Sequence, residues 1–315
     1  MAEKIATVAT REAYGNALVE FGEKYEDIVV LDADLSASTK TANFKKKFPE
    51  RFVNCGIAEG NMMAVAAGFA STGKIPFASS FAMFAAGRAY EQIRNAVGYP
   101  HLNVKIGATH AGITVGEDGA THQCCEDIGI MRTIPGMAIL NPADAVESRA
   151  AVEAAILHNG PVYMRFGRYS VPVIFDKETY KFEFGKGVQI SEGKDASIIA
   201  TGIMVAEAIK AREILAADGI DAAVVNIHTI KPIDKDIIIK AAKTGAIVTA
   251  EEHNIIGGLG SAVAEVLSEN SPCLMGRIGI KDVFGRSGKA EELMKIYEIT
   301  ADDIAKKVKD IVISK

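Results

Sequence analysis

Two histidines and two carboxylates lie within thirteen residues of this chain, between His110 and His122. The acids are Glu117 and Asp118, and three glycines make the segment too polar and too glycine-rich for a core element. Polar loops of this length commonly carry function. The two histidines lack the i, i+4 spacing of helical metal ligands and no thiolate pair accompanies them. The pattern therefore favours proton transfer and hydrogen bonding to a substrate over a metal site.

Glu59 is a second candidate for chemistry, because it stands among Gly56, Ala58 and Gly60 where a helix is expected to begin. A carboxylate in that position ordinarily compensates the helix dipole. The small neighbours would also allow a flat group to approach closely. An acid buried beside a ring has a raised pKa and can share a proton with a ring nitrogen, so Glu59 is either a dipole partner or a proton-sharing group.

Aromatic and basic residues are candidates as well. Phe81 and Phe84 are three positions apart, which suits core packing, or a stacking platform if Glu59 faces the same cavity. Arg11 and Arg168 are surface residues by default. Arg168, however, follows a predicted strand at its carboxyl end, where a guanidinium can clamp a phosphate or a carboxylate.

The elements that must position these residues follow a βα pattern, in which β-branched apolar runs alternate with helical periodicity. This pattern predicts an α/β fold of two domains with mainly parallel sheets flanked by helices, about 1–185 and 190–315. A looser segment over 169–195 reads as a surface linker between them. The expected strands are 28–34, 75–81, 102–110, 137–142, 162–168, 196–201, 222–227, 246–250 and 275–280. The expected helices are 11–25, 59–71, 84–97, 143–158, 205–217, 234–243, 261–269 and 302–313.

Composition excludes several classes of protein. The 315 residues are 49% hydrophobic and 24% charged with a net charge of −5, and no stretch concentrates Lys and Arg, so we expect no nucleic-acid or membrane-surface partner. The start lacks the layout of a signal peptide, and no apolar run approaches the ~20 residues that span a bilayer. Four cysteines at neither disulfide density nor CxxC spacing predict free thiols in a reducing, cytoplasmic setting.

The motifs together resemble the transketolase family of thiamine-diphosphate enzymes. Two of them are Ala33-Asp34-Leu35-Ser36-Ala37-Ser38 and Asn54-Cys55-Gly56-Ile57-Ala58-Glu59. The most specific is Ala108-Thr109-His110 followed by Gly116-Glu117-Asp118-Gly119-Ala120-Thr121-His122-Gln123. These resemble the pyrimidine-binding domain, and Glu251-Glu252-His253 with Gly257-Gly258-Leu259-Gly260 resembles the C-terminal domain. The resemblance covers essentially the whole chain.

The resemblance implies a role for each candidate residue. Glu59 is expected to hydrogen-bond the cofactor's pyrimidine nitrogen, with Phe81 and Phe84 in the aromatic pocket around that ring and Asp34 near the cofactor across a subunit interface. The residues expected to contact substrate oxygens are His110, Asp118 and His122, and those expected to bind the substrate phosphate are Arg11, Ser38 and Arg168. This implies ketol transfer between sugar phosphates in the pentose phosphate pathway.

Two departures from the family pattern stand out. A further pocket aromatic is replaced by Ala86-Gly87, with Tyr90 a turn later. More importantly, the sequence contains no Gly-Asp-Gly, the motif that with a downstream Asn holds Mg²⁺ and the diphosphate in full-length transketolases. A separate N-terminal subunit is therefore expected to hold Mg²⁺ and the diphosphate, in a heterotetramer that also involves self-association.

Other functions remain open at this point. Deoxyxylulose-phosphate synthase shares the Gly-x-Asp-Gly-x-Thr-His loop, although His110 favours transketolase. A pyruvate dehydrogenase-type β subunit is also a separate chain, but it is not expected to carry Asp118-Gly-Ala-Thr-His122. A split relative that acts on another sugar, a non-catalytic assembly subunit and a flavodoxin-like or dinucleotide-binding module are further alternatives. Against the dinucleotide-binding module, no Gly-x-Gly-x-x-Gly follows the first strand of this sequence.

Overall fold

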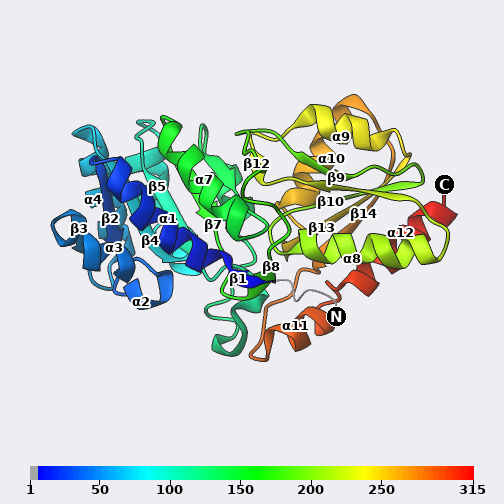
Figure 1. Cartoon of the computed structure of the whole chain (residues 1–315), viewed down its shortest axis with the longest axis horizontal. Coiled ribbons are helices and arrows are strands. Elements are labelled where there is room, and N and C mark those ends of the chain that lie inside the picture. The colour runs from blue at the N-terminus through cyan, green and yellow to red at the C-terminus, as the bar shows by residue number, and fades with distance from the viewer. Residues whose placement is uncertain (1–5) are drawn as a thin grey trace.

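The computed structural model describes residues 6–315 and shows two α/β units side by side (Figure 1). The first is built on a seven-stranded sheet in the order β12-β6-β7-β5-β4-β2-β3, and the second on a five-stranded sheet in the order β14-β13-β10-β11-β9. Within these two sheets the antiparallel pairs are β12 with β6 and β9 with β11, and the other pairs are parallel. The predicted fold class is confirmed.

The first unit contains most of the first half of the chain. Its sheet strands are β2 (Ile28–Asp32), β3 (Phe52–Asn54), β4 (Ile75–Phe81), β5 (Lys105–Thr109), β6 (Ala138–Leu140), β7 (Val162–Arg165) and β12 (Thr229–Lys231). Its helices are α1 (Thr10–Lys24), α2 (Ser36–Thr39), α3 (Ala42–Lys47), α4 (Glu59–Ser71), α5 (Tyr90–Gln92), α6 (Asp127–Arg132) and α7 (Ala145–Leu157). The 3₁₀ and π-helical segments are η1 (Pro49–Arg51), η2 (Met83–Arg88), η3 (Ile93–Gly98) and η4 (Ile113–Asp118).

The second unit follows the same βα plan. Its strands are β9 (Val188–Ser191), β10 (Ala196–Ala200), β11 (Ala222–Asn226), β13 (Ala246–Asn254) and β14 (Leu274–Ile280). Its helices are α8 (Met204–Ala217), α9 (Lys235–Ala242), α10 (Leu259–Asn270), α11 (Ala290–Ile296) and α12 (Ala301–Ile313). A two-stranded ribbon of β1 (Thr7–Ala9) and β8 (Ser170–Pro172) lies between the units in Figure 1.

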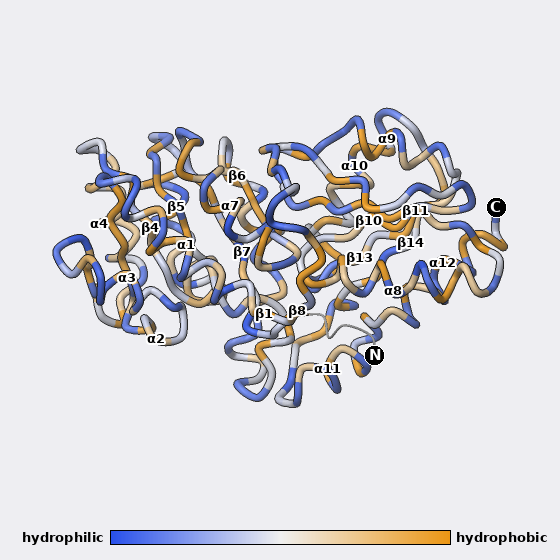
Figure 2. The backbone as a smooth tube through the Cα atoms, viewed as in Figure 1, coloured by the Kyte–Doolittle hydropathy of each residue, from blue (hydrophilic) through white to orange (hydrophobic). Residues whose placement is uncertain are grey.

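Burial on both faces of each sheet explains why the strands read as continuous apolar runs. All residues of β2, β5, β10 and β11 are buried. Figure 2 shows apolar stretches along the strands and polar colour on many of the connecting loops. One apolar cluster includes Ile106 and Ile139 of the first sheet together with Ile199 and Val225 of the second. The two units therefore share a core.

The predicted linker over 169–195 is wrong in one respect, because it contains two strands. β8 pairs with β1, and β9 forms an antiparallel edge of the second sheet. A third short strand, β12, comes from the second half of the chain and pairs with β6 of the first sheet. Strands of three or four residues have too few positions to show a period, so only tertiary pairing defines them.

The helix predicted over 84–97 is not a regular α-helix. Two π-helical segments, η2 and η3, flank the single turn α5. A π-turn inserts an extra residue per turn and changes the direction of every later side chain. The apolar periodicity of the segment predicted a helix but could not predict this change of register.

A buried ion pair joins three segments at the junction of the units. The guanidinium of Arg165 on β7 donates from Nε to Asp127 on α6 at 2.9 Å. Its Nη2 donates to the carbonyl oxygens of Cys124 at 3.2 Å and Glu252 at 2.9 Å. The Tyr163 hydroxyl also donates to Asp127 at 2.9 Å. Arg165 is 4% exposed, so these bonds form away from water.

Two further predictions from composition can be compared with the structure. No helix within residues 6–315 is both long and apolar enough to cross a membrane. The four cysteines are free, as predicted, and Cys124 and Cys125 are buried.

Replacing Arg165 should strongly destabilise the protein. Arg165→Ala leaves the carboxylate of Asp127 buried without its charge partner, which typically costs about 3–5 kcal/mol. Arg149 is the matched control: it pairs with Glu20 at the surface, where both side chains are about half exposed, so Arg149→Ala should cost under about 1 kcal/mol. Urea denaturation followed by circular dichroism measures both, and equal losses would contradict a special role for the Arg165 pair.

Candidate active site

The candidate residues gather at the carboxyl edge of the first sheet. Phe81 is the last residue of β4, His110 follows β5, and Asp34 lies two residues beyond β2. Glu59 begins α4, the helix after the edge strand β3. Because β5, β4, β2 and β3 are consecutive neighbours in the sheet, their carboxyl ends meet at one edge, where α/β proteins bind ligands.

Four rings form an aromatic cluster at this edge. Phe81 stacks on Phe84 with centroids 5.7 Å apart and on the His110 imidazole with centroids 3.8 Å apart. The His122 ring meets Phe84 edge-on at 5.3 Å. Phe84 is only partly buried, so the cluster is more than core packing. The arrangement suits a platform for a flat ring.

Arg88 connects the buried Glu59 to the same aromatic cluster. The Glu59 side chain is fully buried, and its two oxygens accept hydrogen bonds from Nη1 of Arg88 at 3.1 and 2.9 Å. The guanidinium of Arg88 also lies 4.6 Å from the centroid of the Phe84 ring. One planar group thus bridges the buried acid and the aromatic platform.

Sequence reasoning did not find Arg88. Arg88 is the last residue of the π-helical segment η2, and the altered register there decides where its side chain points. No motif marked it, and only the structure brings it to Glu59.

The His110 imidazole has a defined proton position. Its Nε2 lies 3.0 Å from Nη1 of Arg11, and a guanidinium can only donate, so Nε2 accepts. The proton is then on Nδ1, which donates to the Thr109 hydroxyl at 2.9 Å. Burial, followed by the positive charges of Arg11 and Arg168, lowers the pKa of His110 to about 3. The ring is therefore neutral at physiological pH.

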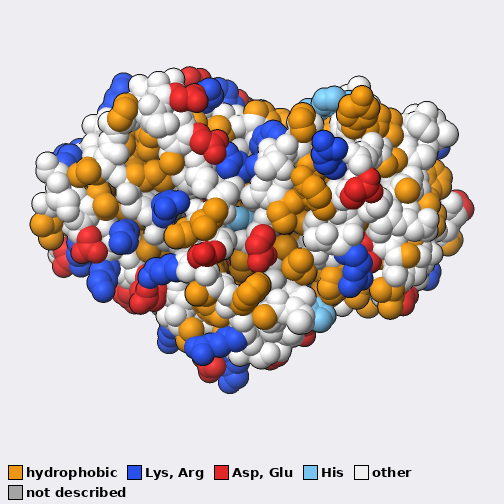
Figure 3. Space-filling model, turned by 180° about the vertical axis from the view of Figure 1, so that it is seen from behind, with side chains coloured by type: hydrophobic (Ala, Val, Ile, Leu, Met, Phe, Trp, Pro, Cys, Tyr) orange, Lys and Arg blue, Asp and Glu red, His pale blue; other side chains and the backbone are white. Residues whose placement is uncertain are grey.

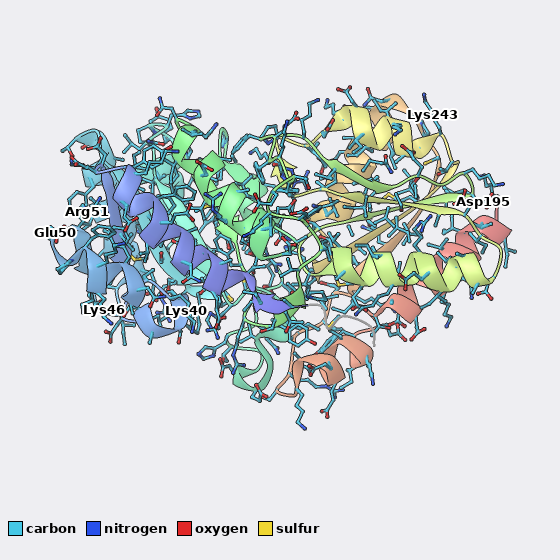
Figure 4. The ribbon with its side chains drawn as sticks, in the orientation of Figure 1. Lys40, Lys46, Glu50, Arg51, Asp195 and Lys243 are labelled. Atoms are coloured by element: carbon cyan, nitrogen blue, oxygen red, sulfur yellow. The ribbon has the colours of Figure 1, made fainter. Side chains whose placement is uncertain are left out.

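Positive groups surround this imidazole. Arg11 also donates to the Ser38 carbonyl oxygen at 2.9 Å, and Arg168 pairs with Glu117 at 3.0 Å. Lys40, labelled in Figure 4, is a further cation whose charge lowers the pKa of His110. The sequence analysis missed Lys40, because the matching motif ends at Ser38 and nothing in the local pattern separates Lys40 from a surface lysine.

The structure separates two candidates from the buried cluster. Asp34 is exposed, with a left-handed backbone (φ 65°), and its carboxylate accepts from the Asn54 side chain at 3.1 Å. Asp118 is exposed at the end of η4. Both lie on the open side of the site, where a ligand or another chain can reach them.

The donor set fits one part of the cofactor that the sequence implies. A buried carboxylate beside an aromatic platform, with small residues around it, suits an aminopyrimidine ring. Gly56 has φ 69° and no neighbouring atom within 4 Å of an added Cβ, so space is open at the start of α4. Residues 6–315 contain no group of three or more His, Cys, Asp or Glu placed to hold a metal ion.

Comparison with known proteins gives the family. The pyrimidine-binding domain of transketolase matches residues 6–173, and the transketolase C-terminal domain matches residues 185–304. The chain belongs to the transketolase family. This is a family of transferases, and membership implies thiamine diphosphate as the cofactor.

Transketolase relatives of similar length align along the whole chain. A Methanocaldococcus jannaschii protein named for a transketolase C-terminal section is 56% identical over 95% of this chain and 94% of its own length. A 6-deoxy-6-sulfo-D-fructose transketolase subunit from a Clostridium strain is 45% identical over 96% of this chain and 94% of its own length. A solved split-gene transketolase, an inactive β4 tetramer, is 52% identical with a TM-score of 0.90, over 98% of this chain and 99% of that one.

The His110 imidazole should stay neutral from about pH 8 down to about pH 5 in the isolated chain. Burial and the flanking cations lower its pKa to about 3, so it gains no proton in this range. Nitrogen-15 NMR of histidine-labelled protein should show the tautomer with the proton on Nδ1. The variant Arg11→Met should raise this pKa, because it removes the nearest cation. A wild-type midpoint near the ordinary value of about 6.5 would contradict the assignment.

Proposed function

We propose that the chain is the pyrimidine-binding subunit of a split transketolase that moves a two-carbon ketol unit between sugar phosphates. The observation that carries this proposal is the meeting of buried Glu59, the Phe81–Phe84 platform and neutral His110 at one sheet edge. A non-catalytic assembly subunit would not need this set of groups. We further propose two domains, 1–185 and 190–315, of which the first carries the site.

Each residue has a distinct task in this proposal. When bound, thiamine diphosphate supplies a carbon nucleophile and an electron sink for the two-carbon fragment. Glu59 shares a proton with the pyrimidine nitrogen, while Phe81 and Phe84 orient the ring by stacking. Asp34, exposed beyond β2, is available to the cofactor from the side of a neighbouring subunit.

A second set of residues holds the substrate. His110, His122 and Asp118 hydrogen-bond the sugar oxygens, and neutral His110 can exchange its accepted Arg11 bond for a substrate hydroxyl. Arg11, Arg168 and the Ser38 segment bind the phosphate, with Lys40 adding positive charge. The positive charges of Arg11, Arg168 and Lys40 near His110 support an anionic substrate.

We infer that a partner chain holds Mg²⁺ and the diphosphate. The sequence has no Gly-Asp-Gly, and the 52% identical split-gene subunit is inactive as a β4 tetramer. Exposed apolar side chains support association: Ile57, two residues before Glu59, is 77% exposed and Phe284 is 85% exposed. Figure 3 shows apolar side chains among the charged ones on the surface of both units.

A second candidate is the same chemistry on a different anionic sugar. The Clostridium relative is named for 6-deoxy-6-sulfo-D-fructose, a sugar with a sulfonate. Guanidinium and ammonium groups recognise a phosphate or a sulfonate by the same charge and hydrogen bonds. The cations of this site therefore favour an anionic sugar without choosing between the two.

Ketol transfer should require two different chains. The assay uses xylulose 5-phosphate and ribose 5-phosphate with thiamine diphosphate and Mg²⁺, for this chain alone and mixed with a chain that carries the diphosphate-binding half. Activity only in the mixture supports the proposal. Activity of this chain alone would overturn the partner assignment. Activity of the mixture only with sulfonated or other sugars would select the second candidate.

Replacing Glu59 by Gln should lower turnover of the mixture by roughly 10²–10⁴-fold, because an amide cannot share the proton in the same way. Arg88 is half exposed and remains solvated after the change, so folding and assembly should persist. Sedimentation checks the assembly, and surface Glu20→Gln is the control. An intact Glu59→Gln assembly with the turnover of the wild type would contradict the proposed role of Glu59.

A further inference from the structure

Two adjacent buried glutamates on β13 serve different units of the molecule. Neighbouring residues of a strand face opposite sides. The Glu251 carboxylate accepts the N–H groups of Leu259 and Gly260 at 2.6 and 2.8 Å, at the start of α10 in its own unit. The Glu252 carboxylate reaches the first unit, where Oε1 accepts the N–H of Thr114 at 2.6 Å. Only Glu252 therefore contacts the loop of the candidate active site.

Thr114 belongs to the loop that carries both site histidines, four residues after His110 and eight before His122. Gly112 packs on the same carboxyl group. A Cβ at Gly112, which has φ 79°, would lie 2.2 Å from Cδ of Glu252. The loop backbone thus rests directly on this carboxylate, with no room for a side chain between them.

Several hydrogen bonds hold the backbone around Glu252. The Arg165 guanidinium binds the carbonyl oxygens of both Glu252 and Cys124, and the Cys124 carbonyl also accepts the Gly112 N–H at 2.8 Å. A second tie comes from Gln123, whose Nε2 donates to the Arg286 carbonyl of the second unit at 3.0 Å. Both ends of the loop are therefore fixed to the second unit.

The charge of Glu252 does not favour folding at neutral pH. Burial raises the pKa of this carboxyl to about 7, while Arg165 and the Thr114 N–H lower it and Asp127 raises it. A carboxyl group whose pKa is raised by folding makes the folded state more stable at low pH. This stabilisation is lost as the pH rises through about 7. What distinguishes this carboxylate is its contact with the Thr114 N–H at 2.6 Å.

We propose that Glu252 is a positioning residue for the reaction proposed above: its carboxylate holds the Thr114 peptide and so sets where His110 and His122 stand. A charged acceptor holds an N–H more firmly than a neutral one, and small displacements of reacting groups lower rates steeply. The second unit thereby takes part in the site without touching the substrate. The activity readout below rests on the proposed function, and the NMR readout does not.

The decisive comparison is Glu252→Gln against Glu251→Gln. Both replace a fully buried carboxylate whose pKa burial raises to about 7, but only the first faces the loop. In the assembled enzyme, Glu252→Gln should lower kcat roughly tenfold or more, with KM for phosphorylated sugars changed less than about twofold. Its melting temperature at pH 8 should equal or exceed that of the wild type. Glu251→Gln should keep kcat within about twofold.

Nitrogen-15 NMR of the isolated, histidine-labelled chain separates this proposal from the proposed function. Glu252→Gln should shift the His110 and His122 signals, and Glu251→Gln should leave them in place. Unshifted signals in Glu252→Gln, or equal kcat losses in both variants, would overturn the positioning role. If Glu252→Gln fails to fold, Glu252→Asp carries the test. It keeps the charge but shortens its reach, so it should shift the same two signals, and wild-type signals would overturn the proposal.

Discussion

The guanidinium of Arg165 is the constraint on which the site depends. It lies at the junction of the two units and binds a carboxylate and two carbonyl oxygens at once, away from water. Through Asp127 it fixes α6, through Cys124 the end of the histidine loop, and through Glu252 the end of β13. A buried charge tolerates few alternative geometries, because each lost bond would leave a desolvated group. The pair therefore gives the two units one relative arrangement at this point.

Charge at the site is arranged so that an imidazole remains neutral among cations. Burial, followed by the charges of Arg11 and Arg168, lowers the pKa of His110, and Arg11 also settles which ring nitrogen carries the proton. A neutral imidazole with a defined tautomer offers one donor and one acceptor in known places. In the proposed function the same cations attract an anionic substrate, so one set of charges has two purposes.

The second unit contributes contacts to the core and to the candidate site of the first unit. It shares an apolar cluster with the first sheet, and Glu252 of its strand β13 binds the histidine loop at Thr114. Its glycine-rich Gly257-Gly258-Leu259-Gly260 segment serves the start of α10, where Glu251 accepts the backbone N–H groups. Glu251 therefore stabilises the start of α10, while the next residue of β13, Glu252, faces the candidate site.

The sequence by itself determined the α/β class and the family and predicted most residues of the candidate site, because these depend on local information. Long apolar runs mark buried strands, and the Gly116–Gln123 string is the most specific of the motifs that resemble transketolase. The tertiary structure alone decided the contacts between distant segments. Arg88 reaches Glu59 because π-turns shift the register, β9 and β12 are strands because an edge is free beside them, and Thr114 meets Glu252 across 138 positions of sequence. None of these contacts produces a periodic pattern in the sequence, because each arises from packing between elements rather than from the secondary-structure propensity of one element.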